Sequence, residues 1–186
     1  MSGSTFSVLF VCSGNICRSP LAEQLLRAKT VGLPVIVSSA GIIAREGEKM
    51  TKEAALVSRQ RGGDPSAHRS RRLTEVHLQQ ADLVLTATRD HRGAVVKLLP
   101  RMSRRTFTIS EFIRLSTTPI DREANSVNDL QAVVEAARSQ RGIVPPPDNP
   151  EDDDIDDPYR RAMEVYEAVG HRIDVEIRMI SDLFRA

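Results

Sequence analysis

The segment VLFVCSGNICRSP, residues 8–20, passes from an apolar run through a polar turn to the start of a helix. Residues 6–11 form a β-rich apolar run, which predicts a buried strand. Ser19, followed by a proline, favours a helix start, because serine is a preferred N-cap and proline suits the first helical turn. Both cysteines of the chain, Cys12 and Cys17, lie in the turn between these elements. The segment therefore predicts a strand–loop–helix unit with its chemistry in the loop.

The same alternation of strands and helices continues along the chain. Further strands are expected at residues 35–38, 82–88 and 106–109, and helices at 19–28, 51–61, 74–80, 89–99, 111–115, 127–141 and 159–184. Alternating strands and helices imply a parallel sheet with right-handed crossovers, and ligands bind such sheets beyond the carboxyl ends of the strands. We therefore expect a single α/β domain over residues 1–186, a flavodoxin-like three-layer sandwich with a four-stranded parallel sheet.

The composition limits the class of protein. The chain has 186 residues, 40% of them hydrophobic, which suits one domain with a sizeable core. The net charge of +1 argues against a nucleic-acid binder, and no apolar run reaches the length of a transmembrane helix or of a signal peptide. Two cysteines provide neither a disulfide scaffold nor zinc-site spacing. We expect a cytoplasmic protein that needs no metal or other cofactor and does not bind membranes.

The opposite charges are unevenly distributed. Residues 1–105 contain 17 Lys and Arg against 8 Asp and Glu, whereas residues 106–186 contain 9 against 17. One half could hold an anion while the other supplies carboxyl groups, or the two halves could pair on folding.

The turn between Cys12 and Arg18 has the composition of an anion site. Gly14 and Asn15 tolerate left-handed backbone, so the turn can direct its N–H groups inward, towards the N-terminus of the next helix. Arg18 can bind a phosphate with two hydrogen bonds, and the same dipoles favour the thiolate of Cys12. A small buried cysteine is the alternative, since Cys-x5-Arg alone is a weak pattern. The flanking strand and the Arg-Ser-Pro helix start favour a catalytic cysteine.

The motif CSGNICRSP resembles the signature of the bacterial low-molecular-weight protein tyrosine phosphatases, and the likeness extends in motif order from about residue 6 to 184. The resemblance implies that Cys12 is a nucleophile that forms a phosphocysteine intermediate. It also implies that Arg18 binds the phosphate and stabilises the transition state. Ser19 is expected to donate a hydrogen bond to the sulfur, both as thiolate and as leaving group.

The resemblance also implies a support for the loop. Asn15 is expected to hold the loop shape through a polar network with Ser39 and His68. The alternative is that these two are a surface serine and a solvated histidine. The residues expected to line the phosphate and substrate site are Ser13, Gly14, Asn15, Ile16, Cys17 and Tyr159.

A general acid is expected in the segment EDDDIDDPYRR, residues 151–161. Phosphoryl transfer to sulfur leaves an oxyanion that needs a proton, and the attacking water later needs a base, so one carboxyl group can serve both steps. The family resemblance assigns this role to an Asp-Pro-aromatic motif, which Asp157 and Tyr159 match. Neighbouring carboxylates would favour protonated Asp157. Tyr159 could stack on an aryl substrate or pack at the helix start.

The rest of the acidic segment has a plainer interpretation. We expect residues 148–154 to be solvated and flexible, the commonest meaning of a run of aspartates. Together with the helix at 127–141 they belong to an insertion expected at about residues 116–153.

A second departure from the family is the sequence TATRDH, where many members have an acidic residue in place of Ala87 or Thr88.

Two residues of the loop bear on substrate and regulation. A related branch resembling arginine phosphatases has threonine where this chain has Ile16, and an aliphatic side chain instead packs against an aryl ring, so phosphotyrosine is preferred. Cys17 is expected to form a reversible disulfide with Cys12 under oxidation, or else to be a packed cysteine. Basic residues expected near the rim, or paired with the acidic half, are Arg45, Lys49, Arg69, Arg71 and Arg72.

Protein-tyrosine phosphatase is therefore the predicted activity, on a tyrosine-phosphorylated protein, with a tyrosine kinase as a candidate partner. A protein-arginine phosphatase and an arsenate reductase on the same fold are the alternatives. A thioredoxin-coupled arsenate reductase needs further cysteines outside the loop, which are missing, although a low-molecular-weight thiol could substitute for them. A non-catalytic phosphotyrosine-binding module would need neither Cys12 nor Asp157. The sequence leaves the oligomeric state open.

Overall fold

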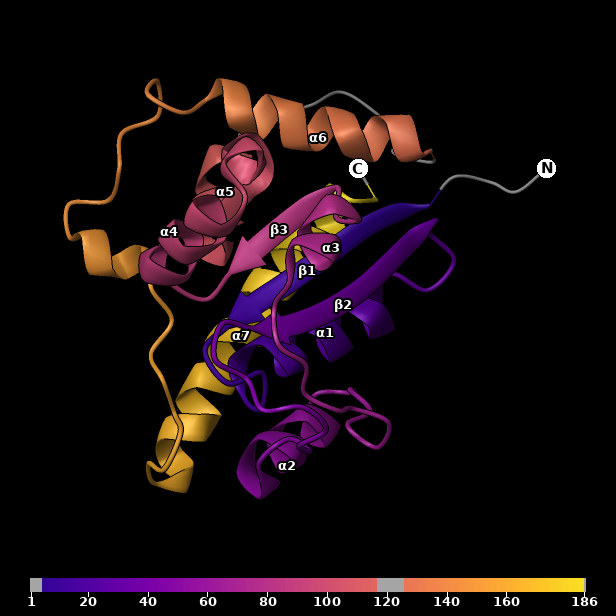
Figure 1. Cartoon of the computed structure of the whole chain (residues 1–186), viewed down its shortest axis with the longest axis vertical. Coiled ribbons are helices and arrows are strands. Elements are labelled where there is room, and N and C mark those ends of the chain that lie inside the picture. Colours follow the sequence, from indigo (N-terminus) through magenta and orange to yellow (C-terminus); the bar gives the residue numbers. More distant parts are fainter. Residues whose placement is uncertain (1–4, 117–125, 186) are drawn as a thin grey trace.

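The computed structural model describes residues 5–116 and 126–185, and its centre is a four-stranded parallel sheet in the order β2-β1-β3-β4 (Figure 1). The strands are β1 Phe6–Cys12, β2 Val35–Gly41, β3 Leu83–Thr86 and β4 Thr106–Thr108. Strand β1 pairs in parallel with β2 on one side and β3 on the other. The predicted three-layer α/β fold with a four-stranded parallel sheet is confirmed.

Helices cover both faces of this sheet. They are α1 Arg18–Lys29, α2 Lys52–Gln60, α3 Glu75–Gln79, α4 Arg89–Leu98, α5 Ile109–Leu115, α6 Val127–Ser139 and α7 Met163–Leu183, with 3-10 helices η1 Pro100–Arg105 and η2 Pro150–Asp153. Among the described residues, no helix combines the length and the apolar character needed to cross a membrane.

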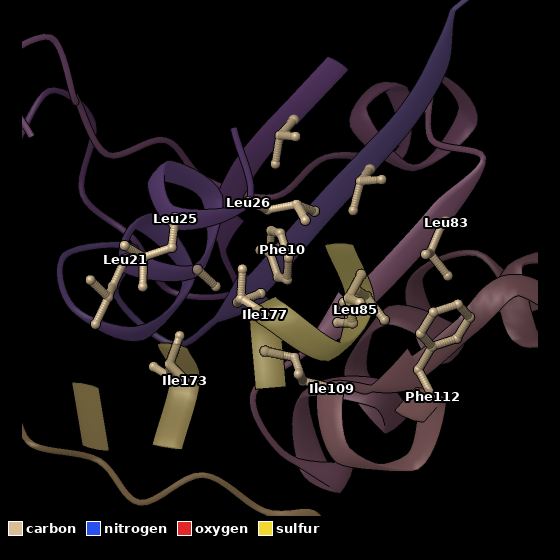
Figure 2. Close-up of a cluster of buried hydrophobic side chains, with 14 of the residues drawn as sticks. Phe10, Leu21, Leu25, Leu26, Leu83, Leu85, Ile109, Phe112, Ile173 and Ile177 are labelled. Carbon is tan, nitrogen blue, oxygen red and sulfur yellow. The ribbon is translucent and has the colours of Figure 1, made fainter. Parts of the chain in front are cut away.

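The side chains of β1 alternate between two hydrophobic clusters. Phe6, Val8 and Phe10 belong to the larger cluster, which α1, α5, α6 and α7 complete. Figure 2 shows Phe10 between side chains of α1 and α7, such as Leu25 and Ile177. Leu9 and Val11 belong to the smaller cluster, together with side chains of α3, α4 and η1. Because both faces are buried, β1 is an almost continuous apolar run, and the loop that follows it starts from a rigid strand end.

Several predicted boundaries differ from the structure, and in three of them a side-chain cap or a backbone conformation explains the difference. Strand β3 ends at Thr86 rather than residue 88, since Thr88 caps α4 by accepting the backbone N–H of His91. Strand β4 ends at Thr108, which forms a capping box with Glu111 and so begins α5 at residue 109. Helix α7 begins at Met163 rather than at residue 159, because Arg160 adopts a left-handed conformation with φ 61° that a helix cannot contain.

Residues 148–152 are exposed, as predicted for a solvated segment, but the prediction is wrong for Asp153 and Asp154. Residues 150–153 form the 3-10 helix η2, and Asp153 is buried. Asp153 pairs with Arg114, and Asp154 pairs with Arg89, so the aspartates are bound by arginines of α5 and α4. Of the expected insertion at about 116–153, residues 117–125 lie outside the described residues. Helix α6 packs its apolar side chains into the larger cluster.

Candidate active site

The nucleophile loop, residues 12–18, begins at the carboxyl end of β1 and ends at the first residue of α1. Of the two residues expected to allow left-handed backbone, only Asn15 has a positive φ, at 55°. The loop packs closely against the end of β2. A Cβ atom at Gly41 would lie 2.5 Å from the carbonyl oxygen of Ser13, so only glycine leaves room for the loop there.

Asn15 is fully buried and is the centre of a polar network. Its Nδ2 donates to Ser39 Oγ at 2.7 Å and to Ser19 Oγ at 3.0 Å. Its Oδ1 accepts the backbone N–H of Arg71 at 3.0 Å, and its own carbonyl oxygen accepts a hydrogen bond from His68 Nε2 at 2.8 Å. Burial lowers the pKa of His68, and the contact with the Asn15 carbonyl oxygen requires a proton on Nε2. The structure thus places Ser39 and His68 against Asn15.

Cys12 lies at the bottom of the loop and is only 2% exposed. Its sulfur is 3.0 Å from Ser19 Oγ. Ser19 accepts a hydrogen bond from Asn15, and its own proton can go either to the sulfur or, over 3.4 Å, to the carbonyl oxygen of Ala40. Within the part of the chain that the structure describes, the backbone N–H groups of Gly14 and Ile16 have no protein acceptor. These donors and the N-terminus of α1 make the loop suited to an anion.

Arg18 connects the nucleophile loop to a distant segment, the acid loop of residues 152–159. Its guanidinium is buried, donates to the carbonyl oxygen of Ile155 at 2.9 Å, and forms an ion pair with Asp157 at 2.7 Å. The Nε atom of Arg18 is buried and has no partner among the described residues. The side chain of Asp157 is 49% exposed, so it reaches both the arginine and the solvent.

Both loops line one cavity of about 420 Å³. Its lining residues are Cys12, Ser13, Gly14, Ile16, Cys17, Arg18, Ile43, Arg45, Glu48, Asp157, Tyr159 and Arg160. Ile43 and Tyr159 are largely exposed at this cavity, with Arg160 stacked over the Tyr159 ring. The expectation that Arg69 and Arg71 lie at its rim is wrong, since they line a separate cavity beside His68.

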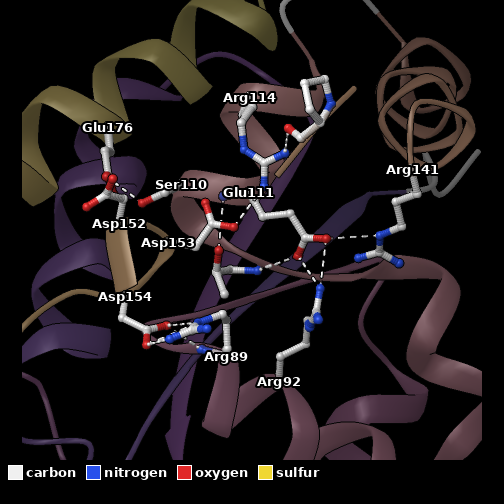
Figure 3. Close-up of polar contacts among 12 residues, drawn as sticks. Arg89, Arg92, Ser110, Glu111, Arg114, Arg141, Asp152, Asp153, Asp154 and Glu176 are labelled. Carbon is white, nitrogen blue, oxygen red and sulfur yellow. Dashed lines mark hydrogen bonds and ion pairs between the residues drawn. The ribbon is translucent and has the colours of Figure 1, made fainter. Parts of the chain in front are cut away.

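Arginines from three helices hold the acid loop in place, and Figure 3 shows two of them, Arg89 and Arg114. Arg89 binds the Asp154 carboxylate at 2.9 Å, and Arg114 binds that of Asp153 at 2.7 Å. Arg172 of α7 donates to the backbone carbonyl oxygens of Asp152 and Asp154, at 2.6 and 2.7 Å.

His91 is a site residue that the sequence did not identify. It is buried in the first turn of α4, with Nε2 2.8 Å from Ser13 Oγ and Nδ1 2.7 Å from Thr88 Oγ1. Burial, followed by the charge of Arg18, lowers the pKa of His91 to about 4. The only signal in the sequence was its place in TATRDH, just beyond the carboxyl end of β3.

Cys17 is the second thiol of the loop and is also buried and free. Its sulfur lies 3.6 Å from Thr51 Oγ1. Burial raises the pKa of Cys17 to about 11, so it is protonated at neutral pH. Among the described residues there is no cluster of three or more His, Cys, Asp or Glu side chains that could hold a metal ion.

The chain matches a protein-family model described as low molecular weight phosphotyrosine protein phosphatase over residues 7–141. It is 40% identical over 109 residues to a protein-arginine-phosphatase of Geobacillus stearothermophilus, covering 58% of this chain and 72% of that protein. It is 33% identical over 138 residues to the probable low molecular weight protein-tyrosine-phosphatase EpsP of Ralstonia solanacearum, covering 74% of this chain and 90% of EpsP.

Solved structures resemble the whole fold. The YwlE arginine phosphatase from Geobacillus stearothermophilus has a TM-score of 0.71 and 29% identity, covering 95% of this chain and 91% of that one. A low molecular weight protein tyrosine phosphatase from T. tengcongensis has a TM-score of 0.70 and 29% identity, covering 96% and 99%.

Proposed function

The chain belongs to the low molecular weight phosphotyrosine protein phosphatase family, and we propose that it hydrolyses phosphotyrosine in proteins through a phosphocysteine intermediate. The observation that carries this proposal is the meeting of three groups in one cavity. A buried Cys12 lies beside the Ser19 hydroxyl, and the Arg18 guanidinium pairs with Asp157 of a loop that is far away in the sequence.

The first step is phosphoryl transfer to sulfur. The Cys12 thiolate attacks phosphorus, the P–O bond to the tyrosine ring breaks, and Asp157 gives its proton to the departing phenolate oxygen. Arg18 and the inward N–H groups bind the phosphoryl oxygens, where they stabilise the charge of the transition state. This role requires Arg18 to exchange its contact with Asp157 for the phosphate, which leaves Asp157 next to the leaving group.

The second step is hydrolysis of the intermediate. Asp157, now a carboxylate, takes a proton from water while the water oxygen attacks phosphorus. The S–P bond breaks, Cys12 leaves as a thiolate, and the Ser19 hydroxyl stabilises that thiolate with a hydrogen bond. The products are the phenol of tyrosine and inorganic phosphate, and both Cys12 and Asp157 return to their starting forms.

The apolar walls of the cavity favour an aryl phosphate. Ile16, Ile43 and Tyr159 line it and can pack against a tyrosine ring. The proposed physiological substrate is a tyrosine-phosphorylated protein. A tyrosine kinase that carries phosphotyrosine is one candidate for this substrate. Phosphoarginine is the second candidate substrate, because the relative of 40% identity described above is a protein-arginine-phosphatase.

The two substrates can be separated by the specificity constant, kcat/KM, on matched phosphotyrosine and phosphoarginine peptides. We expect the wild type to favour phosphotyrosine by at least about tenfold, a difference typical of one well-packed apolar contact. Ile16→Thr should reduce this preference, since a hydroxyl can hydrogen-bond a guanidinium and packs less well against a ring.

Ile16→Val is the matched control, because it is β-branched like threonine but lacks the hydroxyl. It should keep the preference for phosphotyrosine. A wild type that prefers phosphoarginine would overturn the tyrosine assignment, and one that turns over neither peptide would overturn the phosphatase assignment.

We also propose that the loop is protected from over-oxidation by a Cys12–Cys17 disulfide. Both thiols line the same cavity and are free, as formation of a disulfide between them requires. Peroxide would oxidise Cys12 to a sulfenic acid and release water, and the Cys17 sulfur would displace hydroxide to form the disulfide. A dithiol would then reduce the disulfide and restore the thiolate.

A further inference from the structure

The first turn of α4 contacts both loops of the active site. His91 contacts Ser13 of the nucleophile loop, and Arg89 contacts Asp154 of the acid loop. We propose that His91 and Arg89 are positioning residues for the phosphatase reaction, an inference that rests on the proposed function. His91 directs the Ser13 hydroxyl at the phosphoryl group, and Arg89 holds the segment that carries the acid.

The hydrogen bonds around His91 determine which ring nitrogen carries the proton. Thr88 Oγ1 accepts the backbone N–H of His91 at 3.3 Å and lies 2.7 Å from Nδ1. We assign the Thr88 hydroxyl as the donor to Nδ1, because the described residues offer its proton no other acceptor, although a hydroxyl can accept two hydrogen bonds. The ring proton is then on Nε2, which donates to Ser13 Oγ at 2.8 Å.

This arrangement leaves the hydroxyl proton of Ser13 free. Because the Ser13 oxygen accepts from His91, its own proton can only go to another acceptor, and Ser13 lines the active-site cavity. The backbone of Ser13 is held as well, since its carbonyl oxygen accepts the N–H of Ile43 at 3.0 Å. The available acceptor is an oxygen of the bound phosphoryl group, so Ser13 adds a side-chain donor to the backbone donors of the loop.

Arg89 acts on the other side of the site. Its backbone N–H donates to Asp154 Oδ1 at 2.7 Å, and its guanidinium donates to Oδ2 at 2.9 Å. Ile155, which follows Asp154 in the acid loop, donates its backbone N–H to the carbonyl oxygen of Ala87 at 2.8 Å. Since Asp157 is itself half exposed, its position depends on these anchors two and three residues before it.

A pair of isosteric variants tests the role of His91. The amide nitrogen of glutamine reaches the place of Nε2, whereas that of asparagine reaches only the place of Nδ1. We expect H91N to lose about tenfold in kcat/KM on both p-nitrophenyl phosphate and phenyl phosphate, the effect of one hydrogen bond to a charged group. H91Q should stay within about threefold of the wild type on both substrates, because it can still donate to Ser13.

Ser13→Ala makes the His91 test specific. It should lose as much as H91N, and the double variant should lose no more than either single variant, since both changes remove the same donor. Equal losses in H91Q and H91N, or losses that add in the double variant, would overturn the positioning role of His91.

Arg89→Gln tests the positioning role of Arg89, with Arg92→Gln as its control. Arg92 lies on the same helix and also pairs with a carboxylate, that of Glu111, but it does not contact the acid loop. R89Q should lower kcat/KM about tenfold on phenyl phosphate, a poor leaving group that needs the acid, and less than twofold on p-nitrophenyl phosphate. R92Q should change neither value. An equal loss on both substrates in R89Q would overturn the proposal.

Two further measurements do not depend on turnover. The affinity for inorganic phosphate, from isothermal titration calorimetry, should fall in H91N and stay unchanged in R89Q. The amide of Ile155 should exchange its hydrogen faster in R89Q than in the wild type or R92Q. A wild type without phosphatase activity would refute the proposed function, whereas unchanged phosphate affinity in H91N and unchanged exchange in R89Q would refute the two positioning roles.

Discussion

The nucleophile loop and the acid loop face one cavity but are held in different ways. In the nucleophile loop, Cys12, Asn15 and Arg18 are each at most 5% exposed. The polar contacts of Asn15 come from the first turn of α1, from β2 and from residues 68–71. In the acid loop, Asp157 and Tyr159 are nearly half exposed, and the anchors are arginine side chains of α1, α4, α5 and α7.

This difference separates a rigid binding element from an adjustable one. In the proposed reaction, the nucleophile loop must present its donors to the phosphoryl group without rearrangement, for which burial and short hydrogen bonds are suited. The acid loop must let substrate enter and must exchange the Arg18–Asp157 ion pair for a contact with phosphate. A partly exposed ion pair is weak enough to be exchanged in this way.

The largest expected effect comes from the nucleophile. Cys12→Ser should lower kcat/KM by at least about 10⁴-fold, because a serine in this loop is a far weaker nucleophile than a thiolate. Since the phosphate donors remain, the affinity for inorganic phosphate should change by less than about threefold. Steady-state kinetics and calorimetry measure the two quantities. Activity that survives in this variant would mean that another group is the nucleophile.

The next effect comes from the acid loop. Asp157→Ala should lower kcat/KM on phenyl phosphate by about 10²- to 10³-fold, the contribution of a general acid, and by much less on p-nitrophenyl phosphate. Asp156→Ala is the matched control, since Asp156 is an exposed neighbour that does not pair with Arg18. If both variants lose equally, the effect is one of local charge rather than of proton transfer.

Oxidation should distinguish the nucleophile loop from the acid loop. After stoichiometric peroxide, dithiothreitol should restore most of the wild-type activity, whereas Cys17→Ser should recover less than about half, since its Cys12 has no resolving thiol and oxidises further. Asp157→Ala should recover the same fraction of its own activity as the wild type. Full recovery of Cys17→Ser would refute the protective disulfide.

The smallest expected effect is on stability at acid pH. His91 faces Arg18 and the carboxylates of Asp90, Asp154 and Asp157, and its pKa is about 4 against an ordinary value of 6.5. Between these values the unfolded chain binds the proton and the folded chain does not, so stability falls as the pH decreases from 6.5 to 4. We expect His91 to contribute about 2 kcal/mol of this loss after discounting for residual exposure.

Urea unfolding of the wild type and H91Q at pH 7 and pH 4 would measure the contribution of His91. The carboxyl groups titrate in both proteins, so their contributions to the pH-dependent change in unfolding free energy cancel when the two proteins are compared. An equal loss of stability in the two proteins would show that His91 does not remain neutral when folded.

Prediction from the sequence succeeded where the controlling interactions are local. The β-rich run before Cys12, the serine and proline after Arg18, and the apolar periodicity of α6 each predict an element that the structure contains. The boundaries failed where a side chain or a single backbone conformation decides the end of an element. Thr88 and Thr108 cap helices, and the left-handed Arg160 delays α7 by four residues relative to the prediction.

The environment of the acidic segment could not be predicted from the segment itself. A run of aspartates is ordinarily solvated, but here Asp153 and Asp154 meet arginines that lie far away in the sequence. The uneven charge of the two halves, 17 basic residues in the first 105 and 17 acidic residues in the remainder, is partly resolved by such pairs. They include Arg18–Asp157, Lys29–Asp174, Arg89–Asp154 and Arg92–Glu111.

The sequence by itself determined the fold class and the strand–turn–helix form of the nucleophile loop, because a strand, a tight turn and a helix start are specified by neighbouring residues. Only the tertiary structure decided which distant groups complete the site. His91 and Arg89 acquire their roles because parallel strands end at one edge of the sheet, which brings the turn after β3 between the two loops. A contact across that edge depends on packing over long sequence separations, and no local pattern encodes it.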